Sequence, residues 1–134
     1  MTTSLTTRLA IAAWDEAPTR EYDDGSRLTR AAVTLNDGAD GLTGGTFDAV
    51  MYYRPDGTST YVTVMRLDAT LQGRSGSFVL TGEGSYDGTT ATGTSHVVPG
   101  SGTGELARIS GTCTSVSTHA DYPFMPLTLS YYLA

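Results

Sequence analysis

Lysine is absent from this sequence of 134 residues, and its eight arginines are outnumbered by 14 acidic residues. The net charge of −6 leaves no basic surface of the kind that holds nucleic-acid phosphates. A negative protein is also poorly attracted to anionic membrane surfaces. We therefore expect neither a nucleic-acid partner nor a membrane partner.

Cysteine and long apolar runs are equally scarce. Cys113 stands alone, which excludes an internal disulfide and a multi-cysteine metal site. No apolar run approaches the about 20 residues of a membrane-spanning helix, and Met1–Thr7 lacks the pattern of a signal peptide. His96 and His119 lie far apart without acidic neighbours at ligand spacing, so we predict no metal and no cofactor. These absences together predict a soluble, cytoplasmic protein.

Little in the chain favours helices. Sixteen glycines are too flexible for helices, and 23 threonines are stiff at the first side-chain torsion and suit strands. The best helical candidate, residues 15–22, is limited by Pro18 to about one turn. Because 39% of the residues are hydrophobic, a real core can form. The composition predicts an all-β protein.

Eight extended stretches alternate with turn residues such as Pro55-Asp56-Gly57, Asp87-Gly88 and Asn36-Asp37-Gly38. The predicted strands are Leu5–Trp14, Arg27–Leu35, Gly45–Arg54, Ser59–Leu71, Gly76–Tyr86, Thr89–Val98, Leu106–Ser117 and Leu127–Leu133. Short strands at this spacing are typical of an antiparallel sandwich or barrel. We expect one domain over residues 1–134.

Alternation along three of these strands separates a less charged face, which we assign to the interior. Its members are Phe47, Ala49, Met51, Tyr53, Tyr61, Thr63, Met65, Leu67, Phe78, Leu80, Gly82, Gly84 and Tyr86. Gly82 and Gly84 either leave room for a ligand or only relieve crowding where strands bend. A closed eight-stranded sheet is wide enough to be filled by side chains or to hold one small ligand.

Other motifs favour structural interpretations. The loop Gly100–Gly104 lacks the lysine and the following helix of a phosphate-binding loop, so a wide turn at the rim is favoured. A Ser/His/Asp arrangement stays open, although no nucleophile elbow precedes a helix. Cys113 is expected to be a small buried hydrophobe, and His119 a solvated loop residue.

Two strings carry a resemblance to a known family. They are Val97–Leu106 and Leu71–Leu80, joined by Trp14-Asp15-Glu16, Arg27–Ala31 and the Asp56-Gly57 turn. From Ala13 to Tyr132, the chain resembles a family of small bacterial proteins of unknown function related in fold to the allene oxide cyclase barrel. The resemblance implies an eight-stranded antiparallel, calycin-like barrel with a central pocket, and no established reaction. Met65, where that family often has an acidic residue, and Thr81-Gly82, where it has Gln-His, imply a more apolar pocket.

The leading hypothesis is a barrel that encloses a polyketide- or lipid-like molecule and catalyses its cyclisation or isomerisation without a cofactor. Enclosure would hold the substrate in a reactive conformer. The hydroxyl of Tyr53, with His96 as its partner, would polarise a carbonyl. The predicted lining is Trp14, Met51, Tyr61, Met65 and Phe78, with Phe124 at the mouth. The alternatives are a carrier of an apolar metabolite and an interaction module with a filled barrel; related barrels also often pair, so a homodimer is open.

Overall fold

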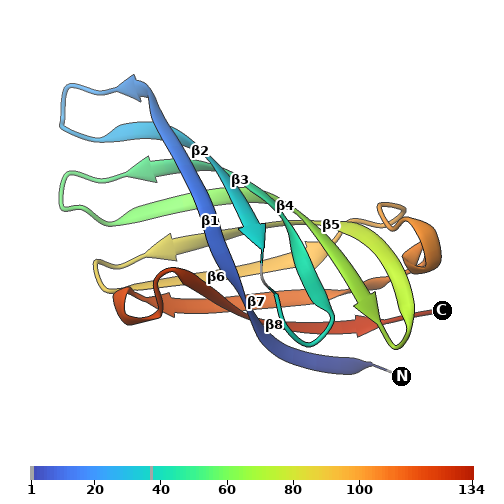
Figure 1. The fold of residues 1–134 in the computed structure, drawn as a ribbon. Helices are drawn as coiled ribbons and strands as arrows, with labels where there is room; N and C mark the ends of the chain where they lie inside the picture. The colour runs from blue at the N-terminus through green and yellow to red at the C-terminus, as the bar shows by residue number, and fades with distance from the viewer. Residues whose placement is uncertain (1, 37) are drawn as a thin grey trace.

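The computed structural model describes residues 2–36 and 38–134, which form eight strands and two short 3₁₀ helices. In chain order the elements are β1 Thr3–Glu21, β2 Arg27–Asn36, β3 Leu42–Tyr53, β4 Ser59–Leu71, β5 Arg74–Tyr86, β6 Thr90–Val97, η1 Gly104–Leu106, β7 Ser110–Thr118, η2 His119–Asp121 and β8 Phe124–Tyr132. Each strand pairs antiparallel with the next, and β8 pairs with β1 (Figure 1). The predicted fold class, a closed eight-stranded antiparallel barrel, is confirmed. Met1 and Asp37, with the turn predicted around Asp37, lie outside the described residues.

Strand β1 closes the ring because it changes partner midway. Its first half, as far as Ala10, pairs with β8, and from Ala10 onward it pairs with β2. Bulges interrupt the β1–β2 ladder between Ile11 and Ala13 and again after Pro18. A bulge tolerates proline, which has no N–H to give to the ladder. The best helical candidate in the sequence is therefore strand instead, and the ring is not even around its axis.

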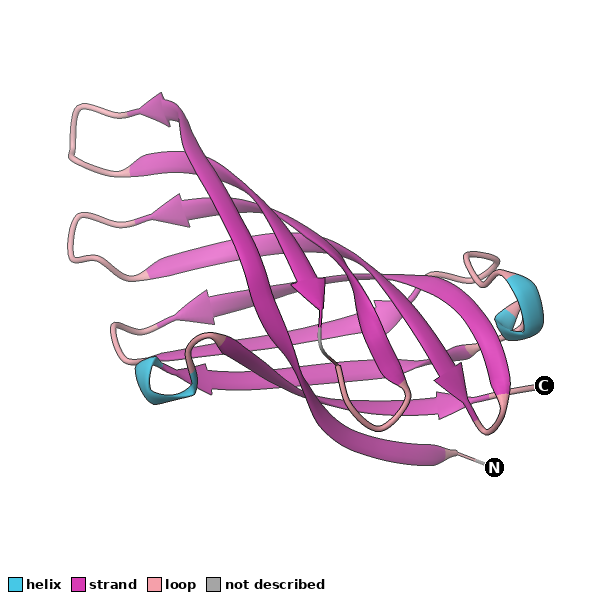
Figure 2. Cartoon of the chain, in the orientation of Figure 1, coloured by secondary structure: helices cyan, strands magenta, loops and turns pink. Residues whose placement is uncertain are grey.

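The two ends of the barrel differ (Figure 2). Both termini, η1 and the β2–β3 and β4–β5 turns lie at one end, and the β1–β2, β3–β4 and β5–β6 hairpins and η2 lie at the other. The glycine-rich loop runs along β5, where the Ser101 hydroxyl accepts a hydrogen bond from the Val79 N–H, and the Glu105 carboxylate accepts one from the Ser75 N–H. Strand β7 begins at Ser110 rather than at Leu106, because Leu106 belongs to η1 and is fully buried.

Apolar side chains fill the end near the termini. The inward faces predicted for β3, β4 and β5 are confirmed by the alternation of buried and exposed residues. Fully or almost fully buried side chains at this end are Leu9, Leu35, Leu42, Leu67, Leu71, Phe78, Leu106 and Leu129. Among the described residues, no helix is long and apolar enough to cross a membrane. The barrel thus has one solid end, and its hairpin end is where a site can lie.

Candidate functional site

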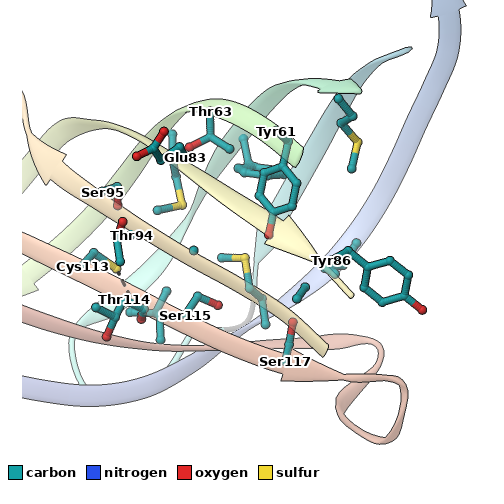
Figure 3. Close-up of a pocket in the computed structure, with 18 of the residues that line it drawn as sticks. Tyr61, Thr63, Glu83, Tyr86, Thr94, Ser95, Cys113, Thr114, Ser115 and Ser117 are labelled. Carbon is teal, nitrogen blue, oxygen red and sulfur yellow. Dashed lines mark hydrogen bonds between the residues drawn. The ribbon is translucent and has the colours of Figure 1, made fainter. Parts of the chain in front are cut away.

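A cavity of about 430 Å³ occupies the hairpin end of the barrel (Figure 3). Small-molecule sites in proteins span roughly 300–1,000 Å³, so the space suits one small ligand. Met51, Met65, Tyr61 and Leu127 contribute apolar wall, and every strand except β2 supplies lining residues. In Figure 3, Tyr86 and Ser117 lie toward one end of the lining, away from Ser95 and Cys113.

The structure brings most of the predicted site residues together. Those that line the cavity are Trp14, Met51, Tyr53, Tyr61, Met65 and Phe124. They come from β1, β3, β4 and β8, which are neighbours only because the ring closes. Trp14 is 45% exposed and Phe124 is half-buried, as expected of side chains near a mouth. Their roles in binding stay predictions.

Two predicted site residues lie elsewhere. His96 is exposed on the outer face of β6, because Ser95 and Val97 take the inward positions on either side of it. Phe78 points inward but is fully buried in the solid end, and it does not line the cavity. The cavity placement expected from the sequence is wrong for both side chains. Neither His96 nor Phe78 can contact a ligand there.

Glu16 is the centre of a polar cluster at the mouth that the sequence prediction missed. Its carboxylate accepts hydrogen bonds from the Trp14 indole N–H at 2.9 Å, the Thr29 hydroxyl at 2.7 Å and the Tyr53 hydroxyl at 2.8 Å. Burial raises the pKa of Glu16, but these hydrogen bonds and the charge of Arg27 outweigh it and leave the pKa below its usual value. The ionised carboxylate therefore fixes the orientation of two aromatic side chains that line the cavity.

The same contact determines what Tyr53 can do. Burial, then the hydrogen bond to Glu16 and its charge, raise the pKa of Tyr53 to about 12. The guanidinium of Arg27 lies over the ring at 4.7 Å from its centroid. Because the phenolic proton is directed at Glu16, the Tyr53 oxygen can accept a hydrogen bond from a ligand, but it is a poor donor to one. This arrangement weighs against the oxyanion-stabilising role predicted for Tyr53.

Replacing Glu16 by glutamine should change the acid stability of the protein. A carboxyl whose folded pKa is lowered stabilises the fold above its unfolded pKa, near 4.5, and this contribution is lost as the pH falls through the folded pKa. Glu16→Gln should therefore have a lower Tm than the wild type at neutral pH, and the gap should narrow below pH 4.5. Thermal unfolding across this pH range measures the effect.

The neighbouring Asp15 provides the control for this prediction, since it is exposed and lies one position along the same strand. The difference in Tm between Asp15→Asn and the wild type should not narrow as the pH falls. The loop carboxyls Asp24, Asp56 and Asp87, whose pKa values are lowered by hydrogen bonds from nearby serine and threonine residues, titrate equally in all three proteins. Parallel curves of Tm against pH for the wild type and Glu16→Gln would show that the Glu16 cluster contributes no pH-dependent stability.

A histidine and a tyrosine meet at the mouth. His119, the first residue of η2, lies with its Nε2 at 2.7 Å from the Tyr86 hydroxyl, and both residues line the cavity. The Tyr86 hydroxyl donates to the Gly88 carbonyl, also at 2.7 Å, so His119 Nε2 is the donor to the tyrosine oxygen. The capping box between Thr118 and Asp121 holds η2 in place. His119 is exposed in the connection between β7 and β8, as expected of a solvated loop residue, and it also lines the mouth of the cavity.

Glycines of β5 and β6 account for the close approach of these two strands and for part of the cavity volume. A Cβ on Gly82 would clash with the backbone of Thr94, so Gly82 serves the close approach of the strands. A Cβ on Gly84 would lie 2.5 Å from the Tyr61 ring, so Gly84 makes room for that ring. Gly93, directly opposite Gly84, faces open space: a Cβ there would meet the Glu83 carbonyl at 3.6 Å and the Tyr61 hydroxyl at 3.9 Å. Gly93 is thus the glycine that leaves cavity volume empty.

Cys113 and Ser115, two other potential nucleophiles in the lining, are not activated. Burial raises the pKa of Cys113 to about 11, so its thiol stays protonated. The Ser115 hydroxyl donates to the Pro126 carbonyl at 2.6 Å, beyond Thr114–Thr128, the last paired residues of β7 and β8. In the part of the chain that the structure describes, no three His, Cys, Asp or Glu side chains converge at a distance suited to a metal ion.

Comparisons with known proteins agree with the fold. A family described as "Protein of unknown function (DUF3224)" matches residues 5–131. The solved structure of a protein of unknown function from the same family, from Shewanella oneidensis MR-1, is 24% identical and superposes with a TM-score of 0.74, covering 100% of this chain and 99% of that one. No curated protein matches the chain. The likeness supports the fold and assigns no activity.

Proposed function

We propose that this chain, a member of the DUF3224 family, binds an apolar, polyketide- or lipid-like small molecule inside its barrel. In this proposal it acts as a carrier or sequestering protein. The observation that carries this proposal is the cavity of about 430 Å³ with Met51, Met65, Tyr61 and Leu127 in its wall. Removing apolar ligand surface from water supplies about 25 cal/mol per Å², which favours such a guest. The filled-barrel alternative does not agree with a cavity of this size.

The two predicted catalytic residues, together with Cys113 in the lining, favour binding over catalysis. The proton of Tyr53 is directed at Glu16, His96 lies outside the barrel, and the Cys113 thiol is held protonated by burial. A catalyst needs a group that can exchange a proton with the substrate, placed within hydrogen-bond reach. None of these three side chains meets that requirement, whereas carriage requires only the apolar enclosure.

Native mass spectrometry of the protein purified from its own cells tests the proposal. We expect a complex heavier than the chain by the mass of one small molecule, which is released on denaturation and extracts into organic solvent. The denatured protein supplies the control, because its mass must return to that of the chain. The proposal fails if the native mass equals that of the bare chain and a lipophilic cell extract adds nothing to it.

The contact between His119 and Tyr86 favours a second function, the cofactor-free cyclase or isomerase expected from the sequence. An imidazole can both accept and donate a proton, and this one lies at the cavity mouth with a phenol as its partner. Bound substrate enclosed by the barrel would be held close to this pair. Catalysis would then depend on His119 instead of His96.

Two histidine-to-glutamine variants distinguish the enzyme from the carrier. With the recovered ligand as substrate, His119→Gln should slow conversion by about a hundredfold, as expected for loss of a general acid or base, and change the ligand Kd by less than about twofold. His96→Gln, the same substitution on the outer face, should leave conversion unchanged. Chromatography of the ligand before and after incubation measures conversion. Recovery of the ligand intact from the wild type would favour carriage over catalysis.

Three further expectations from the sequence stay predictions. They are the kinship with allene oxide cyclase and other calycin-like barrels, the homodimer and the cytoplasmic location. The proposed function requires none of them, since the cavity is formed within one chain.

A further inference from the structure

Exposed apolar side chains form one patch on the outer face of β3 and β4. They are Val50 and Tyr52 of β3 and Val62 and Val64 of β4. Val50 and Val62 lie directly opposite each other in the strand pairing, and each of the other two lies two residues along its strand, on the same face. Single exposed apolar residues are ordinary, but a contiguous group marks a surface that contacts another molecule.

The opposite side of the ring provides a comparison within the same fold (Figure 1). A row of threonines in register crosses the outer face of β6, β7, β8 and β1, and its members are Thr94, Thr114, Thr128 and Thr6. Threonine and valine are both branched at Cβ and both favour strands. Strand formation therefore does not require valine on an outer face, and the valines of β3 and β4 need another explanation.

Opposite charges flank the valine pair. The strand pairing that joins Val50 to Val62 continues to Arg30 on β2 and to Glu83 on β5. The four side chains are exposed and form a row with a cation at one end, two valines in the middle and an anion at the other end. A second copy turned by 180° about an axis along the strands, between β3 and β4, would reverse this row. Arg30 would then face Glu83 of the second copy, so the row is complementary to itself.

The same rotation provides a counter-charge for the acidic residue inside the patch. Asp48 pairs in register with Val64, so it would face Val64 of the second copy. Arg66 lies two residues farther along that strand on the same face, about 7 Å away, within reach of a long side chain. Because the wall of a barrel is convex, contacts at the edge of the patch require long side chains, and Arg30, Glu83 and Arg66 provide them.

We propose that the outer face of β3 and β4 binds a second copy of this chain in a two-fold symmetric dimer. The valines form the centre of the interface, and Arg30 and Glu83 form charge pairs at both edges. A two-fold interface uses the same patch on both copies, and an apolar centre with a polar rim is the usual arrangement. The inference is independent of the proposed function, because none of the four apolar residues of the patch lines the cavity.

Sedimentation equilibrium of the wild type and two valine variants tests the apolar centre. The wild type should be largely dimeric at about 100 μM. Val62→Thr should weaken the dimer at least about tenfold, because the apolar contact is lost on both copies. Val116→Thr is the matched control: Val116 is 57% exposed, against 56% for Val62, but it lies on β7 opposite Thr92. Its dimer should have the wild-type Kd. A wild type that is monomeric at this concentration, or equal weakening by both variants, would overturn the proposal.

Exchange of the two edge charges tests the two-fold arrangement. Arg30→Glu and Glu83→Arg each place like charges at both edges, so each variant alone should dimerise about tenfold more weakly at low ionic strength. In an equimolar mixture of the two variants, opposite charges face each other again at both edges. The mixed dimer, which native mass spectrometry resolves by mass, should therefore form with an affinity within about threefold of the wild type.

Two results would overturn this arrangement. One is a dimer that neither single charge reversal weakens, and the other is a mixture that associates no better than either variant alone. Both substitutions are at exposed positions on the outer face, so far-UV circular dichroism and the Tm should match the wild type. Matching values assign any loss of association to the interface and not to the fold.

Discussion

Gly93→Phe is expected to abolish ligand binding while the barrel stays folded. A Cβ at this position would meet no atom closer than 3.6 Å, so the backbone accepts a side chain. The benzyl group would then project into the cavity beside Tyr61 and occupy the space of the guest. We expect the Kd for the neutral fluorescent probe N-phenylnaphthylamine to rise by at least about a hundredfold, or about 2.7 kcal/mol. Filling apolar space should also hold or raise the Tm.

The matched control is Thr92→Phe, which places the same side chain one residue earlier on β6. Thr92 is exposed on the outer face, so its substitution adds bulk outside the barrel only. Probe affinity should not change. Two results would contradict the assignment of the cavity as the binding site: wild-type affinity in Gly93→Phe, or equal losses in both variants at unchanged stability.

Phe78→Ala should have the largest effect on stability, with a loss of about 3–5 kcal/mol in the free energy of unfolding. Phe78 is fully buried at the solid end, paired in register with the fully buried Leu67. Truncation leaves a void that the surrounding strands can collapse around only in part. Domains of this size are stable by roughly 5–15 kcal/mol, so the loss should be evident as a shift of the urea unfolding midpoint.

Phe124→Ala is the comparison for this prediction. Phe124 is half-buried at the mouth, where the Arg8 guanidinium lies 4.0 Å from its ring centroid. Its truncation should cost less stability than Phe78→Ala and more probe affinity, because it removes lining and leaves the solid end intact. The opposite order, with Phe124→Ala the less stable protein, would contradict the division of the barrel into a solid and a hollow end.

Local patterns predicted the direction of most side chains and little about their depth. Alternation identified the inward faces of β3, β4 and β5, since period two is a property of each strand alone. It could not place Phe78, because an inward side chain lies at the solid end or the hollow end according to the register of all the strands. His96 was misplaced because its direction was judged from Val98, which lies beyond the end of β6.

The polar contacts at the mouth join residues far apart in the chain. Glu16 meets Thr29 and Tyr53 only after β1, β2 and β3 have paired, so no local spacing could have predicted the cluster. His119 lies in the connection between β7 and β8. It meets Tyr86 only because the fold brings η2 beside the end of β5. The change of partner within β1, which closes the ring, likewise leaves no local pattern beyond the bulges themselves.

A crystal structure under xenon pressure would show whether the hairpin end of the barrel is hollow, because dry apolar cavities bind xenon and filled or water-lined ones do not. We expect a xenon atom inside the hairpin end, among Met51, Met65 and Cys113. Side chains that fill this space, with no xenon inside the barrel, would contradict it.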